Sequence, residues 1–97
     1  MVPKVKCIYN QLAYTFYFYS NDHEPPHVHV KRAGGEWEIR VYFLLCTKDE
    51  LKYDVKKPFK LKRIMSRDEK EILELICKKR EQLYNEWCNV VKTNKRN

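Results

Sequence analysis

The stretch NDHEPPHVHVKRAGGEWEIRVYF, residues 21–43, predicts a β-hairpin of defined register. Apolar and polar residues alternate on both sides of Gly34-Gly35, and two consecutive glycines readily supply the positive φ values of a two-residue hairpin loop. That loop determines which residues face each other across the two strands. The predicted pairs are Ala33 with Glu36, Arg32 with Trp37, Lys31 with Glu38, Val30 with Ile39, His29 with Arg40, Val28 with Val41 and His27 with Tyr42.

The hairpin has two chemically different faces, because successive side chains of a strand point to opposite sides. A shift of one residue would place His29 and Arg40 in the core and expose Val30 and Ile39, so the pattern favours one register. We expect the histidines on the solvent-facing side, away from the core. The predicted core face consists of Val28, Val30, Trp37, Ile39, Val41 and Phe43, and the opposite face of His27, His29, Lys31, Glu38, Arg40 and Tyr42.

The hairpin is expected to lie within a small sheet. LAYTFYFYS, which begins at residue 12, alternates in the way of an aromatic strand. Asn21-Asp22 and Pro25-Pro26 then predict a loop, since proline donates no backbone hydrogen bond and restricts the residue before it. The predicted strands lie roughly at 12–19, 27–33, 36–44 and 51–55.

The last third of the chain predicts one long helix, roughly at 66–92. Ser66 and Glu69 have the spacing of a capping box, in which the two side chains satisfy unpaired amides of the first turn. Apolar residues then recur at helical spacing and should pack on the sheet, whereas the tail 93–97 has no apolar anchor and should fray. The apolar stripe is Ile72, Ile76, Leu83, Trp87 and Val91, flanked by Leu73, Leu75, Tyr84 and Val90.

These elements predict an α+β fold, with a small antiparallel sheet of three to four strands packed against one long C-terminal helix. The 97 residues suffice for one domain, 1–97, and 43% of them are hydrophobic. We found no apolar run long enough to cross a bilayer and no secretory leader, so we expect a cytoplasmic protein without membrane contact. Cys7, Cys46, Cys77 and Cys88 form no close pair and should be reduced thiols.

The charge balance favours an anionic partner. Twenty basic and thirteen acidic residues give a net charge of +7, which suits nucleic acid or an acidic protein without distinguishing them. Five of the eight residues in KKPFKLKR, 56–63, are cationic, and such a run can contact phosphates or can be an ordinary solvated connection. The candidate binding residues are Asp22, His23, Lys31, Tyr42, Lys56, Lys57, Lys60, Lys62 and Arg63.

The histidine cluster has more than one chemical interpretation. His27 and His29 would project from the same face of a strand and could act as general acid and base, with Arg40 or Lys31 stabilising phosphate charge, as in a metal-independent ribonuclease. His23, His27 and His29 could instead form a weak site for a divalent transition metal, although we expect no cofactor. In a third interpretation the histidines only specify the fold.

The stretch FYFYSNDHEPPHVHV, together with the hairpin and KKREQLYNEW near the C-terminus, resembles a family of small bacterial proteins catalogued as domain of unknown function family 4160. Its members look like an aromatic strand, then D-H-x-P-P-H-x-H, a hairpin, a link and a helix ending in E-L-x-x-x-W. Leu83 and Trp87 match the last motif. The first motif is matched by Asp22, His23, Pro25, Pro26, His27 and His29.

The resemblance covers most of the chain and implies an α+β fold, a prokaryotic cytoplasmic setting and an association with genes of toxin–antitoxin type. This chain departs from the family pattern in its lysine-rich link and its four cysteines. We therefore expect a toxin–antitoxin-type binding module that contacts nucleic acid or a protein partner. The alternatives are a ribonuclease-like enzyme and a weak metal site, and exposed strand edges would allow a homodimer.

Overall fold

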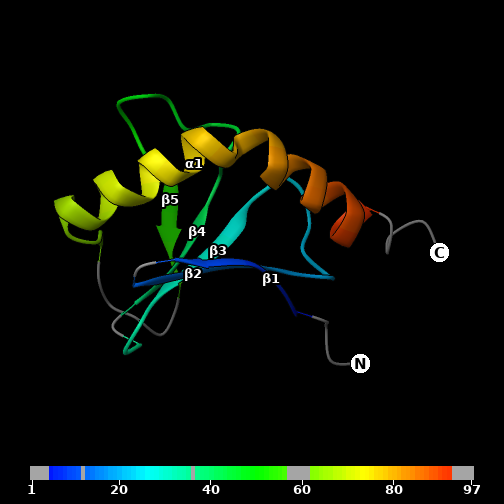
Figure 1. Ribbon diagram of the computed structural model, residues 1–97, viewed down its shortest axis with the longest axis horizontal. Coiled ribbons are helices and arrows are strands. Elements are labelled where there is room, and N and C mark those ends of the chain that lie inside the picture. Colours follow the sequence, from blue (N-terminus) through cyan, green and yellow to red (C-terminus); the bar gives the residue numbers. More distant parts are fainter. Residues whose placement is uncertain (1–4, 12, 36, 57–61, 93–97) are drawn as a thin grey trace.

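A computed structural model describes residues 5–11, 13–35, 37–56 and 62–92. Five strands form one antiparallel sheet in chain order, and a long helix lies across one face of it (Figure 1). The chain therefore has the expected α+β fold, with one strand more than the expected three to four. The elements are β1 (Val5–Gln11), β2 (Tyr14–Tyr19), β3 (Val28–Arg32), β4 (Glu38–Val41), β5 (Tyr53–Val55), α1 (Ser66–Trp87) and the π-helical turn η1 (Cys88–Lys92).

The first strand, β1, is absent from the sequence prediction. It pairs with β2 in a register that shifts between Cys7 and Tyr9: Cys7 lies opposite Tyr17, and Tyr9 lies opposite Phe16. Such an irregularity inserts an extra residue and breaks the two-residue alternation that marks a strand in a sequence. The predicted strands at 12–19 and 51–55 are observed in shorter form as β2 and β5.

The predicted hairpin register is confirmed. Val30 pairs with Ile39 and His29 with Arg40 across β3 and β4. Both loop glycines have positive φ angles, 92° at Gly34 and 73° at Gly35, which L-residues rarely adopt. The whole β3–β4 ladder is Val28 with Val41, His29 with Arg40, Val30 with Ile39 and Lys31 with Glu38.

The core lies between the sheet and α1, on the side that the alternation predicts. All six residues of the predicted apolar hairpin face are buried, as are the five residues of the predicted helical stripe. Phe18 joins these two layers, since its ring centroid lies 5.9 Å from that of Trp87 and 6.4 Å from that of Phe43. Among the described residues, no helix is both long and apolar enough to cross a membrane.

The helix starts at Ser66 as predicted, but the predicted capping box is wrong. Met65 occupies the N-cap position, and no side chain caps the helix. Asp68 is instead buried against the sheet, where it accepts hydrogen bonds from Tyr14 of β2 and Arg32 of β3, each at 2.5 Å. Glu69 accepts hydrogen bonds from Tyr53 and Arg63 rather than turning back to the N-cap. The helix start is thus fixed by contacts to the sheet and to the preceding segment.

These contacts predict unequal effects of two neighbouring substitutions. Asp68→Asn should lower the free energy of unfolding by about 2–4 kcal/mol, because it removes the buried negative charge that pairs with Arg32. Ser66→Ala, the matched control, should change it by less than about 0.5 kcal/mol, because Ser66 is not a cap. Urea denaturation measures both. A larger loss from Ser66→Ala than from Asp68→Asn would restore the capping-box prediction.

Candidate carboxylate–histidine site

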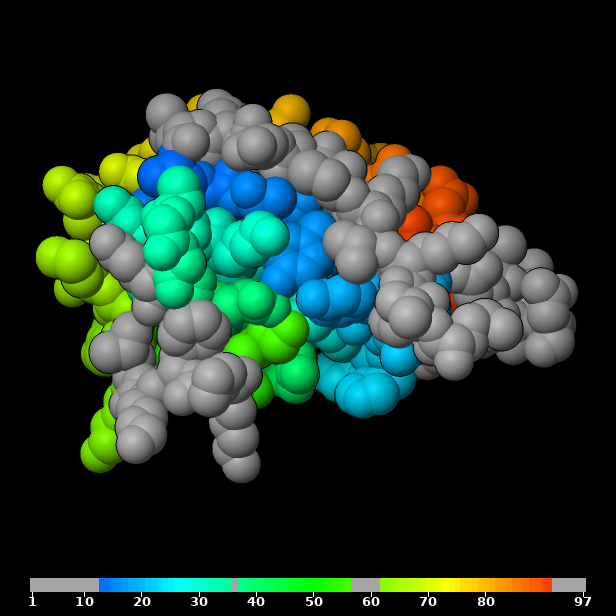
Figure 2. Space-filling view, turned by 90° about the horizontal axis from the view of Figure 1, so that it is seen from below, coloured from blue at the N-terminus to red at the C-terminus, as the bar shows by residue number. Residues whose placement is uncertain are grey.

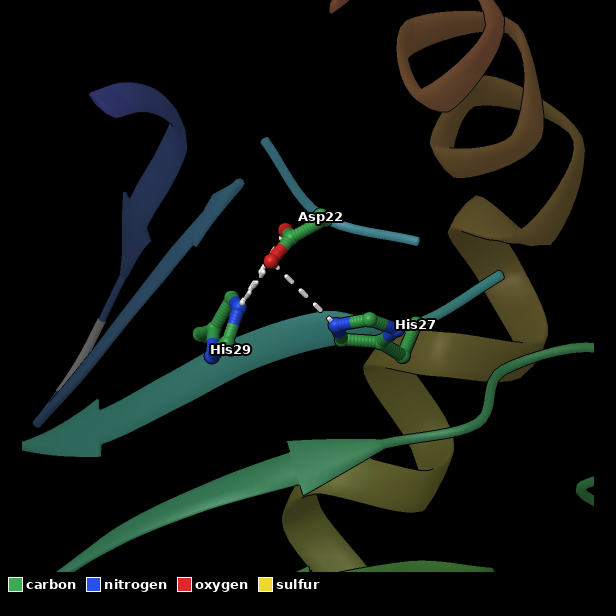
Figure 3. A group of neighbouring side chains, drawn as sticks. All are labelled: Asp22, His27 and His29. Carbon is green, nitrogen blue, oxygen red and sulfur yellow. Dashed lines mark hydrogen bonds and ion pairs between the residues drawn. The ribbon is translucent and has the colours of Figure 1, made fainter. Parts of the chain in front are cut away.

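The loop between β2 and β3 brings Asp22, His27 and His29 together near the C-terminal end of α1 (Figures 1 and 3). Its first part is a tight turn, in which the Asp22 amide donates to the Tyr19 carbonyl at 3.1 Å. The Tyr19 amide in turn donates to Asp22 Oδ2 at 2.9 Å. Asparagine and aspartate favour such turns because their side chains bond to nearby backbone. The turn aims the Asp22 carboxylate toward the start of β3.

Both histidines direct a ring nitrogen at this one carboxylate (Figure 3). His29 Nε2 lies 3.0 Å from Asp22 Oδ1 and 3.2 Å from Oδ2. His27 Nε2 lies 3.4 Å from Oδ1. Asp22 Oδ1 is therefore shared between two imidazole rings that come from positions two apart in the chain.

The two rings are enclosed by aromatic side chains. His29 stacks on Tyr17, with centroids 5.2 Å apart, and meets the edge of Tyr19 at 4.7 Å. The His27 ring centroid lies 5.2 Å from that of Trp87, the last residue of α1. Both histidines are only 2% exposed and Asp22 is 8% exposed. The expected solvent-facing position of the histidines is therefore wrong, because aromatic residues of β2 and α1 cover the rings.

Hydrogen-bond partners determine the proton positions on the two rings. His27 Nδ1 lies 2.9 Å from the Pro25 carbonyl, which can only accept, so Nδ1 carries a proton. A neutral His27 would then turn an unprotonated Nε2 toward a carboxylate oxygen. His29 can donate from Nε2 to Asp22, which leaves its Nδ1 buried without a hydrogen-bond partner among the described residues. The cluster is therefore complete only with an additional positive centre between His27 and Asp22, which is a proton or a cation.

Burial and hydrogen bonding shift the pKa values in this cluster. Burial alone would raise the pKa of Asp22, but the neighbouring His27 and His29 rings and the Tyr19 amide hold that pKa well below its usual range. Burial lowers the pKa of His29 despite the nearby carboxylate. The site thus favours an ionised Asp22 beside a neutral His29.

The other residues predicted on this face have separate surroundings. His23 is exposed and its ring centroid lies 6.2 Å from that of His27. Arg40 lies opposite His29 in the ladder and is half-buried. The Lys31 ammonium lies over the Tyr17 ring at 5.5 Å, and Tyr42 donates its hydroxyl to Asp54 at 2.6 Å. Figure 2 looks onto this face of the sheet, opposite α1.

The basic segment 56–63 is divided in the structure. Lys56 forms an ion pair with Glu38, and the predicted residues Lys57 and Lys60 lie outside the described residues. Lys62 and Arg63 line a groove of about 610 Å³ at the start of α1, together with Lys48 and Lys70. Acidic residues line it as well, and one of them, Glu69, pairs with Arg63. The groove also includes Asp49, Glu50, Leu51, Tyr53, Ser66 and Leu73.

Sequence reasoning missed several residues of both regions. Tyr17 and Tyr19 were assigned only to a strand, although the register with β3 places Tyr17 opposite His29. Lys48 and Lys70 reach the groove from the β4–β5 connection and from α1, and no linear motif joins them to Lys62. The adjacency of Asp22 to the histidine motif was the one available signal for the central carboxylate.

The shared carboxylate predicts a stability effect. Asp22→Ala should lower the free energy of unfolding by about 3 kcal/mol, because it leaves two buried imidazoles and a backbone amide unpaired. Asp54→Ala, an exposed carboxylate with one tyrosine partner, should cost less than about 1 kcal/mol. Urea denaturation of both variants checks this. Equal losses of unfolding free energy in Asp22→Ala and Asp54→Ala would contradict the assignment of Asp22 as the centre of a buried cluster.

Tyr53 in the groove predicts an alkaline transition. Burial and the hydrogen bond to Glu69 raise the pKa of Tyr53 from 10.0 to about 12. The folded state therefore holds this proton more tightly, so its stabilisation is complete below pH 10.0 and lost as pH rises toward 12. The difference in unfolding free energy between wild type and Tyr53→Phe should shrink over that range. A constant difference in urea denaturation would contradict the assignment.

Comparison with known proteins supports the motif-based resemblance. The family model described as domain of unknown function (DUF4160) matches residues 13–88. The match spans β2 to the start of η1 and includes the whole carboxylate–histidine site. Searches of curated proteins and of solved structures give no significant match. The chain belongs to the DUF4160 family of domains of unknown function.

Proposed function

We propose that the protein is a non-enzymatic binding module of toxin–antitoxin type that binds nucleic acid through the groove at the start of α1. The observation that carries this proposal is the gathering of Lys48, Lys62, Arg63 and Lys70 around one groove. Within the described part of the chain, Arg63 pairs with Glu69, whereas no acid forms an ion pair with Lys48, Lys62 or Lys70. Three lysines are therefore available for phosphates.

The overall charge supports the same partner. A net charge of +7 attracts polyanions over distances of about a Debye length, roughly 10 Å at moderate salt. Lys57 and Lys60 come shortly before the groove residues Lys62 and Arg63 in the sequence. Tyr53 in the groove offers an aromatic ring beside these cations, a combination that suits nucleic acid.

The carboxylate–histidine geometry favours binding over ribonuclease chemistry. A general base must reach the ribose hydroxyl whose proton it takes. His27 and His29 instead turn their Nε2 atoms to the same carboxylate and are 2% exposed. We therefore assign the nucleic-acid contact to the groove and expect no cleavage.

A matched pair of double variants tests this proposal. Lys62→Gln/Lys70→Gln removes two groove cations, whereas Lys78→Gln/Lys79→Gln removes the same charge from a later turn of the helix. Fluorescence anisotropy with labelled single-stranded RNA and duplex DNA, over a range of salt concentrations, gives the affinity. The groove variant should bind nucleic acid about 10-fold more weakly. The slope of log affinity against log salt concentration should fall in magnitude by about 1 to 2, and both changes should be smaller in the control variant.

Three results would contradict the proposal. If both double variants weaken binding equally, the effect is one of net charge rather than of the groove. If wild type binds neither nucleic acid at low salt, the partner is of another class, such as an acidic protein. Release of labelled fragments that stops in His27→Ala or His29→Ala would favour the ribonuclease alternative.

A further inference from the structure

We propose that Asp22, His27 and His29 form a binding site for a divalent transition-metal ion, with Zn²⁺ as the representative ion. The site lies by the C-terminal end of α1, whereas the groove proposed to bind nucleic acid lies at the start of that helix. The inference therefore goes beyond the proposed nucleic-acid binding and does not depend on it. It also replaces the predicted trio of histidines, because Asp22 takes the place that the sequence suggested for His23.

Two of the three distances between the ligand atoms are already close to those around one ion. One ligand atom from each of the three residues lies within 4.8 Å of the other two. Zinc bonds of 2.0–2.1 Å at tetrahedral angles place neighbouring ligand atoms about 3.3 Å apart. Asp22 Oδ1 lies 3.0 Å from His29 Nε2 and 3.4 Å from His27 Nε2. An ion can therefore enter with small rotations of the rings.

The proton positions provide a second, independent argument. The Pro25 carbonyl requires a proton on His27 Nδ1, so a neutral His27 directs a lone pair at Asp22 Oδ1. Two acceptors that face each other in a buried site repel, whereas a cation between them is attracted by both. A metal ion thus turns the least favourable contact of the cluster into two coordinate bonds.

His29 can change its tautomer without loss of a proton. Coordination by Nε2 requires that the proton now donated to Asp22 move to Nδ1. His29 Nδ1 is buried and has no hydrogen-bond partner among the described residues, so no existing interaction is broken there. Both histidines then bind as neutral imidazoles, and Asp22 supplies the one negative charge.

The surrounding groups hold the ligands in place. Metal-binding histidines usually donate their second ring N–H to a carbonyl or carboxylate, and His27 does so to Pro25. The Tyr19 amide fixes Asp22 Oδ2 and leaves Oδ1 toward the histidines. Tyr17 and Tyr19 enclose the His29 ring. Preorganisation of this kind lowers the entropic cost of binding an ion.

The donor set also defines the chemical class of the ion. Two imidazoles and one carboxylate suit zinc and neighbouring first-row metals, whereas calcium and magnesium prefer sites made of oxygen ligands alone. Three protein ligands leave at least one coordination position for water or another group. We therefore expect selectivity for Zn²⁺ or Co²⁺ over Mg²⁺.

The experiment is calorimetric titration of chelator-treated protein with ZnCl₂, with MgCl₂ as the comparison ion. Wild type should bind one zinc ion per chain and should gain thermal stability from it, because the ion binds the folded state. Asp22→Asn and His27→Gln should each weaken zinc binding by at least about 10-fold to 100-fold. Mutation of groups that only support the metal ligands already causes losses of this size. His23→Ala, a histidine of the same motif outside the trio, should bind within about 3-fold of wild type.

Co²⁺ absorption spectra separate this site from the thiols of Cys46, Cys77 and Cys88. Histidine and carboxylate ligation gives visible d–d bands without a thiolate-to-metal charge-transfer band. A charge-transfer band, failure of folded wild type to bind zinc, or equal weakening by His23→Ala and Asp22→Asn would overturn the inference. Circular dichroism confirms that each variant is folded, and His27→Gln serves as the second test if Asp22→Asn is not.

Discussion

The loop, the sheet and the end of the helix converge on the buried carboxylate of Asp22. It holds the β2–β3 loop through the Tyr19 amide and receives ring nitrogens of two histidines. One of these histidines pairs with β2 and β4 within the sheet, and the other packs against Trp87 of α1. A buried carboxylate is costly unless it is fully hydrogen-bonded, so the loop sequence and the aromatic cover of the site are mutually dependent.

The sheet separates His29 from the hydrophobic core, whereas His27 borders that core at Trp87. Side chains toward α1 are almost all apolar and buried, whereas the opposite face has Tyr17, His29, Lys31 and Arg40 in neighbouring positions. A second acid, Asp68, performs a comparable task at the other end of the helix, where it joins Tyr14 and Arg32. The helix is thus held on the sheet by apolar contacts along its length and by one polar cluster near each end.

Most of the architecture could be predicted from alternation and turn chemistry. Gly34-Gly35 determined the hairpin register, and the helical stripe from Ile72 to Val91 predicted the buried face of the helix. β1 could not be predicted, because its irregular pairing near Ile8 interrupts the alternation. The expected cap at Ser66 failed for a different reason: the tertiary partners of Asp68 and Glu69 outweighed a local motif.

The candidate site was predictable in its membership but not in its environment. The motif placed Asp22, His27 and His29 close together. The pattern put the histidines on the sheet face opposite the core, and that position was wrongly equated with exposure to solvent. Burial depends on neighbours such as Tyr17 and Trp87, which come from other elements and from no local pattern. The groove cations illustrate the same limit, since Lys48 and Lys70 meet Lys62 only after the chain has folded.

The most direct test of a carboxylate-centred cluster is a long-range ¹H–¹⁵N NMR spectrum of the histidine rings in metal-free protein. Around an organising carboxylate the two rings should have fixed tautomers, with a proton on Nδ1 of His27 and on Nε2 of His29. Averaged signals from His27 and His29, as in free imidazole, would show that Asp22 does not organise the two histidines.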